Sequence, residues 1–311
     1  MRLIFAGTPE TALPSLDAVW SSHHELVAVI SRPDAAKGRG RDLSPSPVAV
    51  RASELGGVPV LKPPSLRDPV FAQEFNELDA DCCPVVAYGG MVPHNLLGGP
   101  RHGWVNLHFS LLPAWRGAAP VQHAILAGDE FTGATTFRLT DGLDTGPVFG
   151  TLTEPVRPDD TAGTLLDRLA VSGAELLLRT LDAIETGTVV AHDQPTVGVS
   201  MAPKLTKDDA RVRWDEPALA IERRIRACTP HPGAWTQHRG DRIGLLPLLG
   251  SSAPDRSALR PGEVRVTKHD VSVGSASGEV RLGHVKPAGK REMLAADWAR
   301  GVRLVDGELL T

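Results

Sequence analysis

The first 31 residues, MRLIFAGTPETALPSLDAVWSSHHELVAVIS (residues 1–31), contain the pattern on which the fold prediction rests. Residues 2–6 form a short apolar run that ends at a Gly-Thr-Pro turn. Residues 10–20 form a segment that is long enough for a helix. Residues 26–31 form a second, β-branched run. A strand, a helix and a second strand in this order favour a parallel pair, because parallel strands need a crossover connection.

The same alternation continues through the first half of the chain. Near-continuous apolar strands separated by helix-sized segments are typical of a sheet covered on both faces. The pattern therefore predicts an α/β fold with a doubly wound, mostly parallel, Rossmann-like sheet. The expected helices are residues 48–56, 68–78 and 162–186, and the expected extended segments are residues 58–61, 84–88, 104–109 and 135–139.

The second half has a different character. Residues 188–207 show no strong period, so we place a domain boundary there: a first domain at 1–188, a linker at 189–206 and a C-terminal domain at 207–311. After one helix near 217–228, several short β runs punctuated by Gly and Pro predict a small β-barrel of the oligonucleotide-binding (OB-like) type. A chain of 311 residues has room for two such domains.

Composition narrows the class of protein. The three cysteines, Cys82, Cys83 and Cys228, give neither a disulfide framework nor a zinc pattern. No apolar run is long enough for a membrane helix, and the apolar start is too short for a signal peptide. We therefore expect a cytoplasmic protein that contacts no membrane.

Charge is distributed unevenly along the chain. Residues 1–200 hold 14 Lys and Arg against 23 Asp and Glu, whereas residues 201–311 hold 19 against 14. The positive C-terminal part is compatible with a polyanionic partner, but a surplus of this size is also compatible with an ordinary surface.

Several common motifs are missing from the sequence. The turn after the first strand lacks the glycines of a dinucleotide fingerprint, and there is no phosphate-binding P-loop. No GxSxG elbow occurs, and the histidines, including the adjacent pair His23 and His24, do not have metalloprotease spacing. The sequence thus predicts no metal site.

Polar residues interrupt the predicted strand at 104–109. Asn106 and His108 are two positions apart, so their side chains face the same side of the sheet, near its carboxyl edge. An amide beside an imidazole suits the stabilisation of an oxyanion combined with proton transfer. A satisfied core Asn and a structural His are the alternative.

A second polar cluster, TDGLDTG at residues 140–146, forms a turn after the expected strand at 135–139. Asp144 is placed to orient His108 and to raise the pKa of its imidazole by charge attraction. A purely structural Asx-type turn is the alternative for this segment.

The segments NLHFSLLPAWRGAAPVQ (106–122) and DGLDTG (141–146) together resemble the folate-dependent formyltransferases. The resemblance implies transfer of a formyl group from 10-formyltetrahydrofolate, as co-substrate and without a metal, to an amine. It implies that Asn106, His108 and Asp144 are catalytic. It also implies that the loop formed by Ser110, Leu111, Leu112 and Pro113 binds the folate. Phe109 departs from the family pattern, which has a small residue there.

The resemblance extends over nearly the whole chain, through residues 5–16, 32–48, 224–235 and 285–301. It is strongest to the branch of the family whose acceptor is initiator methionyl-tRNA. This implies a product, N-formylmethionyl-tRNA, used in translation initiation, with 1–188 as the catalytic domain and 207–311 as a tRNA-contacting domain. Lys37, Arg39 and Arg41 would contact the tRNA, and the protein is expected to be a monomer.

Further phosphate contacts are expected on the C-terminal domain, at Arg224, Arg226, Lys286, Lys290 and Arg291. Two other hypotheses are a formyltransferase acting on an amino sugar or another small amine, and an RNA-binding protein without catalysis. A small-amine formyltransferase would have no function for the basic loop or for the positive C-terminal domain. An RNA-binding protein without catalysis would be expected to have lost Asn106, His108 or Asp144. Folate binding and the choice of acceptor discriminate among the three.

Overall fold

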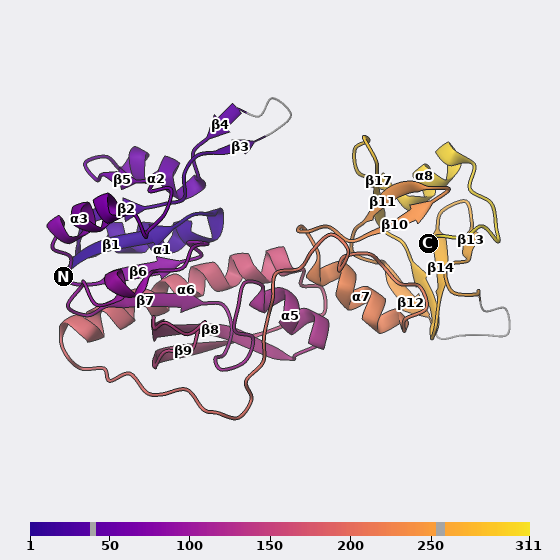
Figure 1. The fold of residues 1–311 in the computed structure, drawn as a ribbon. Coiled ribbons are helices and arrows are strands. Elements are labelled where there is room, and N and C mark those ends of the chain that lie inside the picture. The colour runs from indigo at the N-terminus through magenta and orange to yellow at the C-terminus, as the bar shows by residue number, and fades with distance from the viewer. Residues whose placement is uncertain (38–41, 253–258) are drawn as a thin grey trace. The chain divides into compact units, whose positions relative to one another are not determined.

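The computed structural model describes residues 1–37, 42–252 and 259–311, and the chain divides into two compact units (Figure 1). The first unit combines residues 1–120, 131–155 and 166–201, and the second combines residues 121–130, 156–165 and 202–311. Each unit has its own core, so the two are described separately.

A seven-stranded sheet forms the centre of the first unit. In spatial order its strands are β5 (Val60–Leu61), β2 (Glu25–Ile30), β1 (Arg2–Gly7), β6 (Cys83–Val86), β7 (Trp104–His108), β8 (Phe131–Arg138) and β9 (Val148–Pro155). The five from β5 to β7 are parallel, and β8 and β9 are antiparallel to their neighbours. The predicted mostly parallel sheet is therefore confirmed.

Helices cover this sheet. The elements of this unit are η1 (Glu10–Ala12), α1 (Leu13–Trp20), α2 (Pro47–Leu55), α3 (Pro69–Glu77), α4 (His94–Leu97) and most of α6 (Ala162–Glu185). Helix α5 (Pro120–Ala127) belongs almost entirely to the second unit. Helices α2 and α3 each begin after a capping residue that is followed by proline. The Ser46 side chain accepts a hydrogen bond from the Ala49 N–H, and the Asp68 side chain accepts one from the Val70 N–H. A short hairpin of β3 (Ala35–Lys37) and β4 (Asp42–Ser44) precedes α2.

The core of the first unit explains why α3 and α6 lie where they do. Phe75 on α3 stacks on Trp104 of β7 with ring centroids 5.4 Å apart, and both side chains are buried. On α6, Thr180 hydrogen-bonds Thr136 of β8 at 2.9 Å. A Cβ at Gly173 of α6 would lie 3.0 Å from Leu107 Cδ2, so this glycine allows the helix to approach β7 closely.

The topology collects loops at one edge of the sheet. From β1 the chain proceeds first to β2 and β5, and then returns to the other side of β1 as β6 and β7. Ligands of open α/β sheets bind at such a switch point, beyond the carboxyl ends of the strands. The loops after β1 and β6 are joined there by a hydrogen bond from Thr8 Oγ1 to the Tyr88 carbonyl at 2.8 Å.

The predicted linker at 189–206 needs correction. Residues up to 201 belong to the first unit: His192 pairs with Val148, and Met201 forms a bridge with Arg116. Isolated bridges and side-chain hydrogen bonds hold this segment, and neither leaves a hydrophobic period in the sequence. Strand β9 was also not predicted, because its side chains alternate between partly and fully exposed positions at the edge of the sheet.

The second unit contains two antiparallel four-stranded sheets, as the fold prediction implied. Their orders are β10-β11-β16-β17 and β12-β15-β14-β13. The strands are β10 (Trp235–His238), β11 (Asp241–Leu245), β12 (Gly250–Ser252), β13 (Val264–Val266), β14 (Val271–Ser275), β15 (Gly278–Arg281), β16 (His284–Pro287) and β17 (Met293–Leu294). Two helices, α7 (Ala218–Ala227) and α8 (Ala295–Val302), contribute Ile221, Ile225 and Trp298 to one apolar core with the strands. Across the described residues, no helix has the length and apolar character needed to cross a bilayer.

Candidate active site

Asn106 and His108 lie on β7, between β6 and β8, and their alternate positions place both side chains on one face. His108, the last residue of the strand, is buried, whereas Asn106 is half-buried. Among the described residues, no hydrogen-bond partner is found for the Asn106 side-chain amide. An amide with unused hydrogen-bond donors beside a buried imidazole is more typical of a ligand-binding site than of a core in which every polar group has a partner.

Two neighbours fix the His108 ring. Its Nε2 lies 2.9 Å from the carbonyl oxygen of Trp115, which can only accept, so neutral His108 carries its proton on Nε2. Its Nδ1 faces Asp144, with Oδ2 3.7 Å away. The structure thus brings together two residues that are far apart in the sequence and were predicted to act as a pair.

The net effect on His108 differs from the sequence-based expectation. Burial lowers the pKa of the imidazole below its ordinary value of 6.5, and this outweighs the opposing effects of Asp144 and of the Trp115 carbonyl, which raise it. The expected upward pull of Asp144 is present, but desolvation of a ring at the end of a buried strand is larger. His108 is therefore neutral at neutral pH.

Asp144 sits in a turn whose backbone is unusual. Its carboxylate accepts a hydrogen bond from the Gly117 N–H at 2.8 Å, which ties the 141–146 turn to the loop after β7. Asp144 and Trp115 both have left-handed backbones, with φ of 50° and 59°. Non-glycine residues rarely adopt such φ values, and they concentrate at functional sites.

The predicted folate loop at 110–113 is held firmly against β8. Ser110 is fully buried, and its hydroxyl donates to the Ala114 carbonyl at 2.6 Å. Thr135 Oγ1 donates to the Ser110 carbonyl and accepts from the Leu112 N–H. Because the Ser110 hydroxyl is occupied internally, its role is to shape the loop, and Leu111 and Pro113 are the partly exposed members. Phe109 is buried.

The structure adds residues to the site that the sequence reasoning missed. Gln194 Nε2 donates to the carbonyls of Asp144 and Gly146, both at 2.8 Å, while its Oε1 accepts from Arg116. Ser200 Oγ accepts from the Trp115 N–H at 2.9 Å. Both come from the segment predicted to be a linker. A lone Gln or Ser in an aperiodic stretch carries no signal by which sequence reasoning could have found it.

Replacing Gln194 with Ala should loosen the Asp144 turn. The substitution removes hydrogen bonds to two turn carbonyls and to Arg116, so we expect a loss of about 1–3 kcal/mol in the free energy of unfolding. Turnover should fall because Asp144 is less well placed. Urea denaturation and steady-state kinetics measure the two effects. Gln73→Ala, on the exposed side of α3, is the matched control. Wild-type stability and turnover in Gln194→Ala would refute the bridging role.

The lowered pKa of His108 predicts the pH profile. If the neutral ring is the active form, kcat/KM should fall on the acid side with a midpoint below 6.5, because burial delays protonation. Above that pH, this group should cause no further change. A midpoint at or above 6.5 in a pH series of kcat/KM would contradict the assignment.

The predicted tRNA contacts divide into three groups. Lys37 lies in the β3 strand, whereas Arg39 and Arg41 fall outside the described residues. Arg224 forms two hydrogen bonds with Glu216, and Arg226 pairs with Glu222 and with the Asp160 carbonyl. Arg224 and Arg226 thus have partners within the second unit, and their expected role as phosphate contacts stays a prediction. Lys286, Lys290 and Arg291 are exposed.

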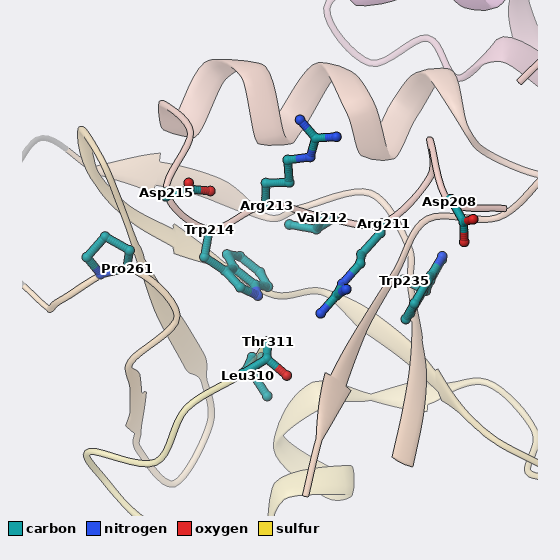
Figure 2. Close-up of a pocket in the computed structure, with 10 residues that line it drawn as sticks. All are labelled: Asp208, Arg211, Val212, Arg213, Trp214, Asp215, Trp235, Pro261, Leu310 and Thr311. Atoms are coloured by element: carbon teal, nitrogen blue, oxygen red, sulfur yellow. The ribbon is translucent and has the colours of Figure 1, made fainter. Parts of the chain in front are cut away.

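The second unit also has a cavity of about 510 Å³ (Figure 2). Figure 2 shows Arg211 beside the Trp235 ring, and its guanidinium carbon lies 5.5 Å from the ring centroid. The Arg242 guanidinium lies 4.4 Å from the same centroid. Two cations on one aromatic ring, with Arg211 exposed, make this surface a positive and aromatic site of the unit.

Both parts of the chain match known protein-family models. Residues 1–181 match the family model described as "Formyl transferase", and residues 204–303 match "Formyl transferase, C-terminal domain". The solved structure of HypX from Aquifex aeolicus in complex with tetrahydrofolic acid superposes with a TM-score of 0.64 at 17% identity, covering 99% of this chain and 48% of that chain. The chain belongs to the formyl transferase family.

Relatives place it more narrowly. It is 61% identical to a methionyl-tRNA formyltransferase of Thermobifida fusca, over 99% of this chain and 98% of the relative. It is 60% identical to one of Salinispora tropica over the full length of both. Within the family, the chain is a member of the methionyl-tRNA formyltransferases.

Proposed function

We propose that this protein transfers the formyl group of 10-formyltetrahydrofolate to the α-amino group of methionine on initiator methionyl-tRNA. The observation that carries the proposal is the grouping of Asn106, His108 and Asp144 at the carboxyl edge of the sheet, with His108 and Asp144 3.7 Å apart. The full-length relatives named for this acceptor support the tRNA substrate, and a structural relative that binds tetrahydrofolic acid supports the donor.

The geometry suggests how the reaction proceeds. The neutral amine attacks the formyl carbon on N10 of the folate, and negative charge develops on the formyl oxygen. The unused Asn106 amide donates a hydrogen bond to that oxygen. His108 Nδ1, which lacks a proton, accepts the proton released by the amine, and Asp144 stabilises the imidazolium. The oxyanion then re-forms the carbonyl as the C–N10 bond breaks, and N10 takes the proton from the His108 imidazolium, which returns His108 to its neutral form.

The remaining assignments follow from this proposal. Residues 110–113 form one wall of the folate site, through Leu111 and Pro113 and the backbone that Ser110 and Leu112 shape. The first domain, 1–188, together with the attached 189–201 segment, supplies the chemistry. The C-terminal domain, 207–311, and the basic residues Lys37, Arg39 and Arg41 bind the tRNA.

The direct test measures transfer of labelled formyl from 10-formyltetrahydrofolate to methionine-charged initiator tRNA. Charged elongator tRNA and free methionine serve as parallel acceptors. We expect strong transfer to the initiator alone. Folate binding without transfer to any of the three would move the acceptor to a small amine such as an amino sugar, and RNA binding without folate binding would favour a non-catalytic protein.

Replacing Arg211 with Ala should weaken tRNA binding without affecting folate binding. The exposed guanidinium beside Trp235 is suited to a backbone phosphate, so its loss should reduce the dependence of log affinity on log salt by about one unit. Titrations of tRNA at several salt concentrations measure this. Arg213→Ala is the control, because that exposed side chain points away from Trp235 (Figure 2). An unchanged salt slope for Arg211→Ala would exclude the contact.

A further inference from the structure

A cluster of imidazoles and carboxylates lies at the other edge of the first unit. His23 and His24 occupy the turn before β2, and Asp182 and Glu185 lie on the last turn of α6. The turn before β2 is at the amino ends of the parallel strands, whereas the catalytic His108 is at a carboxyl end. The cluster is thus separate from the site of formyl transfer.

The atoms of this cluster converge without satisfying one another. His24 Nε2 and Asp182 Oδ1 form an ion-pair contact at 3.1 Å whose geometry is not that of a hydrogen bond, and within the described ranges neither of these buried atoms has a hydrogen-bond partner. The His24 side chain is 0% exposed. His23 Nδ1 lies 3.9 Å from the same Asp182 oxygen. Buried polar atoms that lack partners are costly, so their convergence here calls for a ligand.

The spacing suits a metal ion. Two ligand atoms bound tetrahedrally to zinc at about 2.0–2.1 Å lie roughly 3.3 Å from each other. One ligand atom from each of His23, His24 and Asp182 lies within 4.8 Å of the others. In the part of the chain that the structure describes, this is the one such group of His, Cys, Asp or Glu side chains. We propose that these three residues bind a divalent transition-metal ion, with zinc as the best-fitting one.

The neighbours of the two histidines determine which ring nitrogen carries the proton. His23 Nε2 lies 2.7 Å from Glu185 Oε2, a contact that places the proton there and leaves Nδ1 to bind the ion. His24 Nδ1 lies 3.2 Å from the Met1 ammonium, which can only donate, so the ring carries its proton on Nε2, facing Asp182. Binding of an ion at Nε2 would therefore displace this proton, as metal binding to protonated ligands does. Carboxylates on the far nitrogen of a ligand histidine are the usual outer contacts of metal sites.

The exposure of the cluster also fits an ion site. The His23 side chain is 64% exposed, which leaves an open side for a water molecule to complete four-coordination. An ion here would join the end of α6 to the start of β2, and its role would be structural.

The test uses the full chain and zinc chloride alone. Titration against a competing chelator should show one saturable site for the wild type. His23→Ala and Asp182→Asn should weaken it by more than about tenfold. Both positions are at least partly exposed, so the variants should fold; variants of the buried His24 are avoided for that reason. His94→Ala is the control, because His94 faces Asp141 at 3.0 Å as an exposed pair, with no third ligand group among the residues that the structure describes.

Thermal unfolding gives a second readout that does not depend on activity. Because the ion binds only the folded state, zinc should raise the Tm of the wild type and of His94→Ala but not of the other two variants. Cobalt in place of zinc should give the visible absorption of a tetrahedral nitrogen and oxygen site. The absence of saturable binding, or wild-type affinity in both His23→Ala and Asp182→Asn, would overturn the proposal.

Discussion

Replacing Asp144 with Ala is expected to lower kcat for formyl transfer by about 10²–10⁴-fold, while affinity for tRNA stays near that of the wild type. The substitution removes the carboxylate that faces His108 at 3.7 Å and that holds the Gly117 N–H at 2.8 Å. The imidazolium formed during proton transfer then has no counter-charge, and the 117 loop loses its anchor. Single-turnover transfer and a tRNA binding titration separate the two quantities.

A neighbouring acid provides the matched control for this experiment. Asp141 lies in the same turn, but its side chain is 68% exposed and faces His94 rather than His108. Asp141→Ala should therefore retain nearly full turnover. If Asp144→Ala remains as active as Asp141→Ala, the role given to Asp144 is wrong, and the turn is only structural.

Replacing Asn106 with Ala is expected to cost about 10²–10³-fold in kcat, the effect found when one oxyanion donor is lost. The half-buried amide has no partner to lose among the described residues, so folding should be little affected. A donor that acts mainly in the transition state should alter kcat much more than KM. Steady-state kinetics with the folate and the tRNA varied in turn test this.

Two comparisons make the Asn106 result decisive. Asn95→Ala, at an exposed position of α4, should behave as the wild type in both kinetics and stability. A fall in Tm that accounts for the loss of activity in Asn106→Ala would instead indicate a structural amide. A change in KM alone would point to substrate binding rather than oxyanion stabilisation.

The parts of this protein that sequence reasoning predicted are those where local pattern and tertiary structure agree. Buried parallel strands are apolar throughout, so β1, β2, β6 and β7 were visible as runs, and the helices expected at 48–56 and 68–78 correspond to α2 and α3. Asn106 and His108 were visible because polar residues stood out in such a run. The spacing of two placed them on one face.

What the sequence did not show depends on contacts between distant segments. Gln194 serves the Asp144 turn through backbone carbonyls, and carbonyls have no sequence signature. Arg224 looked like a free cation until the fold placed Glu216 beside it. The pair His23 and His24 was dismissed for its spacing, because the third group of that cluster comes from the end of α6. The net pKa of His108 required its burial to be known.

The segment at 189–201 has a mechanical consequence. The chain leaves the catalytic unit through Ser200 and Met201, which are bonded to Trp115 and Arg116. Trp115 in turn supplies the carbonyl that orients His108. A displacement of Ser200 would therefore reach the His108 imidazole through two hydrogen bonds, so the orientation of that ring is coupled to the position of the chain at residue 200.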